Sequence, residues 1–89
     1  MEARRIILKG RVQGVGFRYF VFRQSQRFPV GGWVRNLWNG DVEVFAEGES
    51  QPLNQFIASI RSGPPAAFVS DFEEESAKPQ DIQDFKIKG

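Results

Sequence analysis

The stretch GRVQGVGFR, from Gly10 to Arg18, combines residue types that could bind an anion. It lies between an apolar run and a helical pattern, and a turn from strand into helix leaves the first backbone N–H groups of the helix without partners. The helix dipole adds about half a positive charge at that point. Gly14 and Gly16 allow consecutive N–H groups to point into one concavity, and Arg18 adds a planar guanidinium that matches phosphate. The stretch therefore indicates a site for an anion with several acceptor oxygens.

Two simpler interpretations of this stretch stand beside the first. Glycines after a strand often only form a turn, and a single arginine is often a solvated surface residue. The common nucleotide motifs do not apply, because no Gly-Lys-Ser/Thr follows and the glycine spacing does not fit a dinucleotide fingerprint. The loop alone leaves phosphate binding and a plain turn both open.

The residue types that the chain lacks narrow the possible chemistry. It has no cysteine and no histidine, so it lacks a thiolate nucleophile, the usual general base near pH 7 and the commonest metal ligand. Phosphatases that form a phosphoenzyme need Cys, His or a suitable Asp, and metal phosphatases cluster His with carboxylates. The carboxylates here lie mostly in strand and tail positions, and Glu73–Glu75 form an acidic run typical of a solvated face. We therefore expect neither a metal nor another cofactor.

Hydrophobic patterning predicts two helices and several strands around this loop. The first helix is expected at 17–27, ended by the segment FPVGG, and the second begins near Ser50, which can cap it, and ends before Gly63. Strand patterns occur at 4–10, 32–38, 41–47 and 68–75, with a tight Asn39-Gly40 turn joining the second and third. A polar loop is expected at 76–82, and Phe85 and Ile87 share one face of the closing segment. Packing in the core or at its rim is expected for Trp33, Trp38, Tyr19 and Phe45.

The order strand, helix, strand, strand, helix, strand makes two split strand–helix–strand units. It predicts an α+β fold, a ferredoxin-like βαββαβ sandwich with a four-stranded antiparallel sheet and two helices on one face. With 89 residues there is room for one domain, which we expect to span 1–89.

The charge balance bears on possible partners. The chain has 12 basic and 11 acidic residues, a net charge of +1, which is too balanced for a broad nucleic-acid or membrane surface. The charged residues among 1–40 are all basic apart from Glu2, so this half of the chain should attract a small anion. No apolar stretch reaches 18 residues, and the first residues are charged, so neither a transmembrane helix nor a signal peptide is expected. We expect a cytoplasmic monomer with no nucleic-acid or membrane partner.

Two motifs taken together resemble the acylphosphatase family. They are GRVQGVGFR at 10–18, with VQGVGFR as its most specific part, and GWVRN at 32–36, the second followed by the Asn-Gly turn. The pair at this separation is far more specific than either motif alone, and GPPAAFV at 63–69 is similar to the family's segment after its second helix. The resemblance runs from the first strand to the last, and the ferredoxin-like fold of that family agrees with the predicted order of elements.

The resemblance implies an enzyme that hydrolyses acyl phosphates to a carboxylate and inorganic phosphate by direct attack of water, without metal or phosphoenzyme. In this family the arginine that ends the glycine loop binds the phosphoryl group, and it falls on Arg18. Loop amides form a cradle around the same oxygens, here from Val12, Gln13, Gly14, Val15, Gly16, Phe17 and Arg18. The family's catalytic asparagine, which positions the water, falls on Asn36. By residue type alone, an asparagine near a hairpin is more often a turn former. Arg11 and Arg35 lie in the motifs, but we expect no catalytic role for either.

Elementary chemistry fits this implied reaction. Backbone N–H groups and a guanidinium can orient water and neutralise oxygen charge, but they cannot help an alkoxide to leave. A carboxylate, whose parent acid has a pKa of about 4, needs no such help. We expect small and aromatic acyl groups to be accepted alike, because only the phosphoryl group has a defined receptor in the sequence.

Departures from the family pattern and two rival functions remain. Pro29, Asn39 and Phe68 stand where other residues are usual in the family, which puts local loop shape in doubt. One rival is a ferredoxin-like module that binds nucleic acid, although the basic-Gly-aromatic string of RNA-recognition domains is missing. The other is an acylphosphatase-like domain that binds an anion without catalysis.

Overall fold

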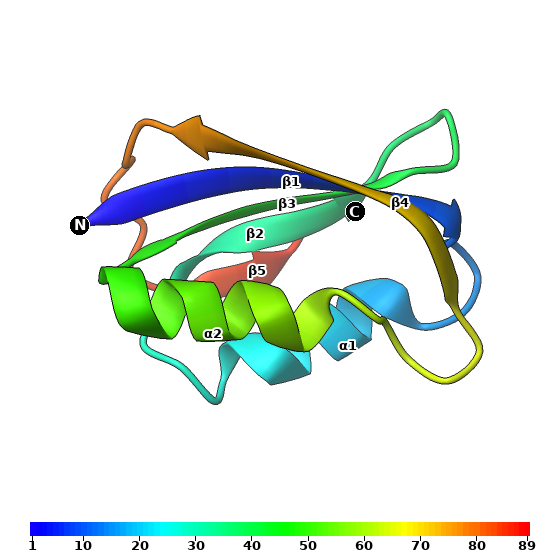
Figure 1. The fold of residues 1–89 in the computed structure, drawn as a ribbon, viewed down its shortest axis with the longest axis horizontal. Helices are drawn as coiled ribbons and strands as arrows, with labels where there is room; N and C mark the ends of the chain where they lie inside the picture. Colours follow the sequence, from blue (N-terminus) through cyan, green and yellow to red (C-terminus); the bar gives the residue numbers. More distant parts are fainter.

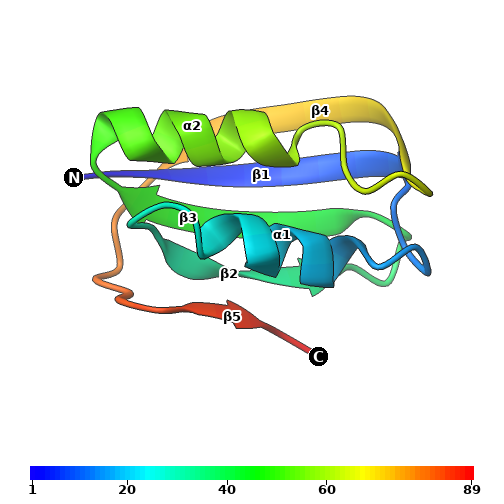
Figure 2. The ribbon, with the colours of Figure 1, turned by 90° about the horizontal axis from the view of Figure 1, so that it is seen from below.

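The computed structural model describes all 89 residues. Its elements are β1 (Glu2–Arg11), α1 (Phe17–Ser25), β2 (Gly31–Asn36), β3 (Val42–Gly48), α2 (Ser50–Ile60), β4 (Phe68–Ala77) and β5 (Phe85–Ile87). The strands form one sheet in the order β4-β1-β3-β2-β5, and both helices cover the same face of it (Figure 1, Figure 2). Strands β1 to β4 pair antiparallel, so the predicted ferredoxin-like class with two helices on one face is confirmed. Neither α1 nor α2 has the length and apolar character of a membrane-spanning helix.

The predicted count of four antiparallel strands is wrong, because β5 adds a fifth strand parallel to β2. Gly32 pairs with Phe85, and Val34 pairs with Ile87. Strands β4 and β5 lie at opposite edges of the sheet, so the segment between them passes the end of the sheet (Figure 2). The buried carboxylate of Glu47 accepts hydrogen bonds from backbone N–H groups of that segment. A hydrophobic pattern of three residues cannot show which strand it joins.

Several element boundaries also differ from the prediction. Helix α1 ends at Ser25 and not at residue 27, and β2 ends at Asn36, so its connection to β3 spans residues 37–41 and is not a two-residue turn. Ser76 and Ala77, expected in a polar loop, are the last residues of β4, where Ala77 pairs with Ala3 of β1. Ser50 is the first residue of α2 instead of its cap, and the N-cap residue Glu49 makes no side-chain hydrogen bond there. The extension of β4 depends on its pairing with β1, which local sequence does not specify. The start of α2 differs by a single residue, which is within the one or two residues by which helix ends vary.

The expectation of core or rim packing holds for two of the four aromatic side chains and fails for two. Phe45 is buried, and its ring stacks on that of half-buried Trp33 with the ring centroids 5.9 Å apart. Trp38, at the tip of the β2–β3 connection, is 99% exposed, and Tyr19 is 60% exposed. Neither exposed ring is part of the core.

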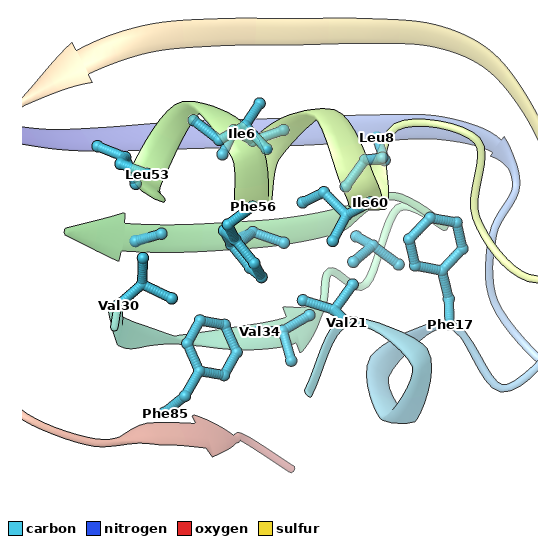
Figure 3. Close-up of a cluster of buried hydrophobic side chains, with 14 of the residues drawn as sticks. Ile6, Leu8, Phe17, Val21, Val30, Val34, Leu53, Phe56, Ile60 and Phe85 are labelled. Carbon is cyan, nitrogen blue, oxygen red and sulfur yellow. The ribbon is translucent and has the colours of Figure 1, made fainter. Parts of the chain in front are cut away.

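The core lies between the sheet and the two helices (Figure 3). Val21 of α1 and Phe56 of α2 are completely buried, and Phe85 of β5 packs edge-on against Phe56 with the ring centroids 5.6 Å apart. Full burial of a side chain of this size stabilises the fold by about 1.5–3 kcal/mol. Phe17, the neighbour of Arg18, is also buried in this core. The core therefore fixes the start of α1, and with it the end of the glycine loop.

The opposite face of the sheet carries a network of ion pairs. Glu43 of β3 is only 2% exposed, and its carboxylate accepts hydrogen bonds from Arg5 of β1 and Arg35 of β2. The hydrogen bond with Glu43, followed by the one with Glu75, raises the pKa of the Arg5 guanidinium. Arg35 therefore belongs to the ion-pair network on this face, where its guanidinium also lies over the ring of Trp33.

Candidate active site

The glycine loop joins β1 to α1 at the end of the sheet where the β2–β3 connection also lies (Figure 1). Gly14 and Gly16 adopt φ angles of 74° and 77°, and Gly16 is the N-cap residue of α1. A Cβ at either position would meet no other atom within 4 Å. The left-handed backbone, and not crowding by the chain, is therefore what favours glycine at both positions.

The loop leaves a series of backbone donors open. No backbone carbonyl accepts a hydrogen bond from the N–H groups of residues 13–18, and the first such bond in α1 runs from Phe20 N to Gly16 O. The helix has no side-chain cap and no acidic residue in its first turn. The positive end of the α1 dipole is thus not neutralised by the chain, which suits an external anion.

A pocket of about 280 Å³ lies against this loop. Its lining consists of Val12, Gly14, Gly16, Phe17, Arg18, Tyr19, Asn36 and Ile87. The structure therefore brings Arg18 from α1 and Asn36 from the end of β2 to one pocket, together with four of the other residues predicted for the cradle. The lining holds no carboxylate, and no group of three or more potential metal-binding side chains occurs in the structure.

Arg18 contacts the residue that follows β5. Its Nη1 donates a hydrogen bond to the carbonyl oxygen of Lys88 at 3.2 Å. The backbone N–H of Lys88 in turn donates to Val34 O at 2.8 Å, and the Lys88 ammonium lies 4.6 Å from the ring centre of Trp33. This contact uses one of the five N–H donors of the guanidinium, so the others remain available to a ligand.

Gln13 and Val15, both predicted for the cradle, do not line the pocket. Gln13 Nε2 donates hydrogen bonds to Leu37 O at 2.7 Å and to Asp41 O at 2.9 Å, which are the two ends of the β2–β3 connection. Val15 is half-buried and packs against the core. Only their backbone N–H groups can belong to a cradle, while the Gln13 side chain ties the glycine loop to the strand end that carries Asn36.

Two residues of the pocket lining were missed by sequence reasoning. Tyr19 follows Arg18 in the first turn of α1, and this position beside the loop was the signal that could have found it. Ile87 reaches the pocket through the pairing of β5 with β2, for which the sequence offers no local signal.

The family model described as Acylphosphatase matches residues 4–87. The chain is 48% identical over 84 residues to an acylphosphatase of Bacillus licheniformis, covering 93% of each chain. It is 42% identical over 88 residues to an acylphosphatase of Thermotoga petrophila, covering 99% of this chain and 98% of the relative.

Among solved structures, an acylphosphatase from Bacillus subtilis superposes with a TM-score of 0.95 at 38% identity, with 100% of each chain covered. HypF from T. kodakarensis superposes with a TM-score of 0.87 at 33% identity, but all of this chain matches only 12% of that protein. The similarity to separate acylphosphatases thus extends over whole chains in both directions. With the family model matched along almost its full length, this chain belongs to the acylphosphatase family of enzymes.

Proposed function

We propose that the pocket between the glycine loop and Asn36 hydrolyses acyl phosphates by direct attack of water on phosphorus. The observation that carries this proposal is the set of open backbone donors at residues 13–18, next to the pocket that Gly14, Gly16, Arg18 and Asn36 line. Open N–H groups at an uncapped helix start favour a phosphoryl group with several acceptor oxygens.

Arg18 and the loop amides bind the phosphoryl oxygens in this proposal. Because the transition state of phosphoryl transfer is loose, with charge spread over three equatorial oxygens, stabilising those oxygens is most of the catalytic task. The donors are fixed by the fold, through Phe17 in the core and the Arg18–Lys88 hydrogen bond, and they need little reorganisation during reaction.

Asn36 positions the attacking water. A carboxamide is not basic near neutral pH, so it orients the water by hydrogen bonding and does not remove its proton. As the water oxygen bonds to phosphorus, the bond from phosphorus to the bridging oxygen breaks, and the carboxylate leaves with that electron pair. The proton of the water passes to a phosphate oxygen, so the products are a carboxylate and inorganic phosphate. No general acid is needed, because a carboxylate is stable as an anion.

Hydrolysis of acetyl phosphate in the presence of a metal chelator tests the proposal. Arg18→Ala should lower kcat/KM about 10³-fold or more and weaken inhibition by inorganic phosphate, because a charged donor to the phosphoryl group is lost. Asn36→Ala should lower kcat about 10²-fold and leave phosphate inhibition nearly unchanged, because water positioning contributes little to ground-state binding.

Arg11→Ala is the matched control, since it removes an exposed arginine of the same motif that does not line the pocket. Absence of turnover in the folded wild-type protein, with phosphate still bound, would favour an anion-binding module instead. Loss of turnover on adding chelator would contradict the metal-free route.

We further propose that the protein acts as a cytoplasmic monomer, a single domain over residues 1–89, that binds no nucleic acid. The small net charge of +1 supports the last point, because nucleic-acid binding depends on neutralising many phosphates. Sedimentation at micromolar concentration, with and without a single-stranded oligonucleotide, would test oligomeric state and nucleic-acid binding together.

A further inference from the structure

We infer that Tyr19 and Ile87 form an acyl subsite beside the phosphoryl cradle, and that the pocket therefore prefers acyl phosphates with an apolar, in particular aromatic, acyl group. The inference rests on the proposed function, since it assigns the part of the pocket that the phosphoryl group does not fill. It replaces the expectation that small and aromatic acyl groups are accepted alike.

The size of the pocket leaves room for more than the phosphoryl group. Its volume is about 280 Å³. A phosphoryl group has only four heavy atoms. Because the acyl carbon is joined to phosphorus through a single bridging oxygen, the acyl group must lie directly beside the cradle, within the same pocket or at its mouth.

The chemistry of the remaining lining is apolar. Tyr19 and Ile87 are 60% and 42% exposed, and both belong to the small set of large hydrophobic side chains that the fold leaves exposed. They reach the pocket from different elements, Tyr19 from the first turn of α1 and Ile87 from β5. An aromatic acyl group can pack against the Tyr19 ring and the Ile87 side chain, which removes apolar surface on both partners from water.

The same lining offers little to a charged acyl group. Arg18 is the one ionisable side chain of the pocket besides the Tyr19 phenol, and the proposed reaction assigns it to the phosphoryl group. The ammonium of Lys88, the residue after Ile87, lies over the Trp33 ring and does not line the pocket. A second carboxylate on the acyl group would therefore lose hydration without gaining a cation.

The test compares benzoyl phosphate with acetyl phosphate as substrates of the wild type, Tyr19→Ala, Ile87→Ala and the double variant. The wild type should show a higher kcat/KM for benzoyl phosphate. The ratio of the two kcat/KM values should fall about 10-fold in the double variant, the low end of what a hydrophobic pocket can discriminate, because both side chains are partly exposed. Tyr19→Phe keeps the ring and should retain the wild-type ratio.

Inorganic phosphate and a distant variant supply the controls. The inhibition constant of phosphate should change less than twofold in every variant, because the cradle is intact. Phe68→Ala removes another exposed aromatic side chain that does not line the pocket, and it should leave the ratio unchanged. An unchanged ratio in the double variant, or an equal loss for both substrates with weaker phosphate inhibition, would overturn the acyl subsite.

A binding measurement separates this inference from the proposed function. Benzoylphosphonate and acetylphosphonate carry a carbon–phosphorus bond that water cannot cleave, so their dissociation constants report the acyl contacts without turnover. If the wild type hydrolyses neither substrate, the proposed function fails, yet a benzoylphosphonate preference that Tyr19→Ala removes still supports the subsite. Equal binding of the two phosphonates by an active enzyme would contradict the acyl subsite and leave the proposed function intact.

Discussion

The two ends of the sheet both present backbone N–H groups from a loop, but they satisfy them differently. At the end away from the glycine loop, here called the far end, the buried carboxylate of Glu47 accepts hydrogen bonds from Gln80 N at 2.6 Å and from Ile82 N at 2.5 Å. At the end with the glycine loop, the N–H groups of residues 13–18 meet no backbone acceptor. At the far end the anion is part of the chain, whereas the glycine loop leaves its donors to a ligand.

The difference shows that size alone does not identify the site. The far end has the larger cavity, about 480 Å³ against about 280 Å³, and Glu47 is part of its lining. That cavity holds two acidic side chains and no basic one, since its charged members besides the N-terminal residue are Glu47 and Asp84. An anion would be repelled there and attracted by Arg18 at the other end, so open donors and charge decide between the two.

Glu47→Ala should produce the largest effect on stability and the smallest on catalysis. It leaves two N–H groups without an acceptor, which costs about 1–3 kcal/mol for each group. For a domain of this size, each kcal/mol lowers the Tm by about 4–8 °C. Thermal unfolding should therefore show a loss of at least about 10 °C, while the kcat of the folded enzyme stays within twofold.

Glu47→Gln is the matched variant, because it keeps one acceptor oxygen and should recover part of the lost Tm. Added phosphate should stabilise the wild type and Glu47→Ala by the same increment. A variant that keeps its Tm but no longer binds phosphate would reverse the roles assigned to the two ends.

Gly31 and Gly14 lie at opposite ends of the sheet, so their substitutions test the two ends separately. A Cβ at Gly31 would lie 1.8 Å from Ile82 O, so Gly31→Ala must displace the far-end segment and should cost about 1–3 kcal/mol of stability with little change in kcat. Gly14 has open space but a φ of 74°, so Gly14→Ala should cost about 1–2 kcal/mol. Unlike Gly31→Ala, Gly14→Ala should also weaken phosphate inhibition, because it would turn N–H groups of the glycine loop away from the bound phosphate.

Urea unfolding and phosphate inhibition of the two glycine variants would be measured side by side. If Gly31→Ala weakened phosphate inhibition as much as Gly14→Ala, the far end would be coupled to the site and the separation drawn between the ends would be wrong.

Gln13→Leu tests how the glycine loop is held against the β2–β3 connection. It removes two hydrogen bonds to Leu37 O and Asp41 O without changing the pocket lining. We expect kcat to fall about 10-fold, because the distance between the cradle and Asn36 is no longer fixed, and phosphate inhibition to change little. Asn39→Ala is the control, since its hydrogen bonds stay within the same turn; an equal loss of kcat there would indicate a general loosening of the hairpin.

Local patterns predicted the parts of the fold that depend on neighbours in the sequence. Apolar spacing located both helices, and the Asn39-Gly40 turn located the hairpin between β2 and β3. The fifth strand escaped prediction because its partner β2 lies about 50 residues away, and its three residues carry too little pattern to specify a register. The buried state of Glu47 was equally hidden, since it depends on the segment that crosses the sheet end.

The candidate site also has parts that local motifs predict and parts that depend on long-range pairing. Arg18, Asn36 and the glycines follow from motifs, and the structure places them around one pocket. Ile87 enters that pocket only because β5 crosses to the far edge of the sheet, and the side chain of Gln13 points to the hairpin instead of the ligand. The motifs locate the residues that we propose to bind phosphate, whereas long-range pairing decides what surrounds them.

Lys9→Met should have the smallest effect, and one that depends on pH. Lys9 Nζ lies 3.2 Å from Asp41 Oδ2, and this hydrogen bond raises the pKa of Lys9 above its ordinary value of 10.5. A raised pKa means that the pair stabilises the fold fully below this ordinary value, and that the contribution disappears as the pH rises through the higher pKa of the folded state. The urea midpoint of Lys9→Met should therefore lie slightly below that of the wild type from pH 7 to pH 9 and converge with it at more alkaline pH.

Lys78→Met is the control, because Lys78 forms no ion pair with Asp41 or Glu73, and its urea midpoint should not converge with that of the wild type at alkaline pH. Gln13→Leu should show a difference independent of pH in this range, because its hydrogen bonds to Leu37 O and Asp41 O involve no titrating group. A pH-independent loss in Lys9→Met would mean that the lysine acts by packing its aliphatic chain and not by its charge.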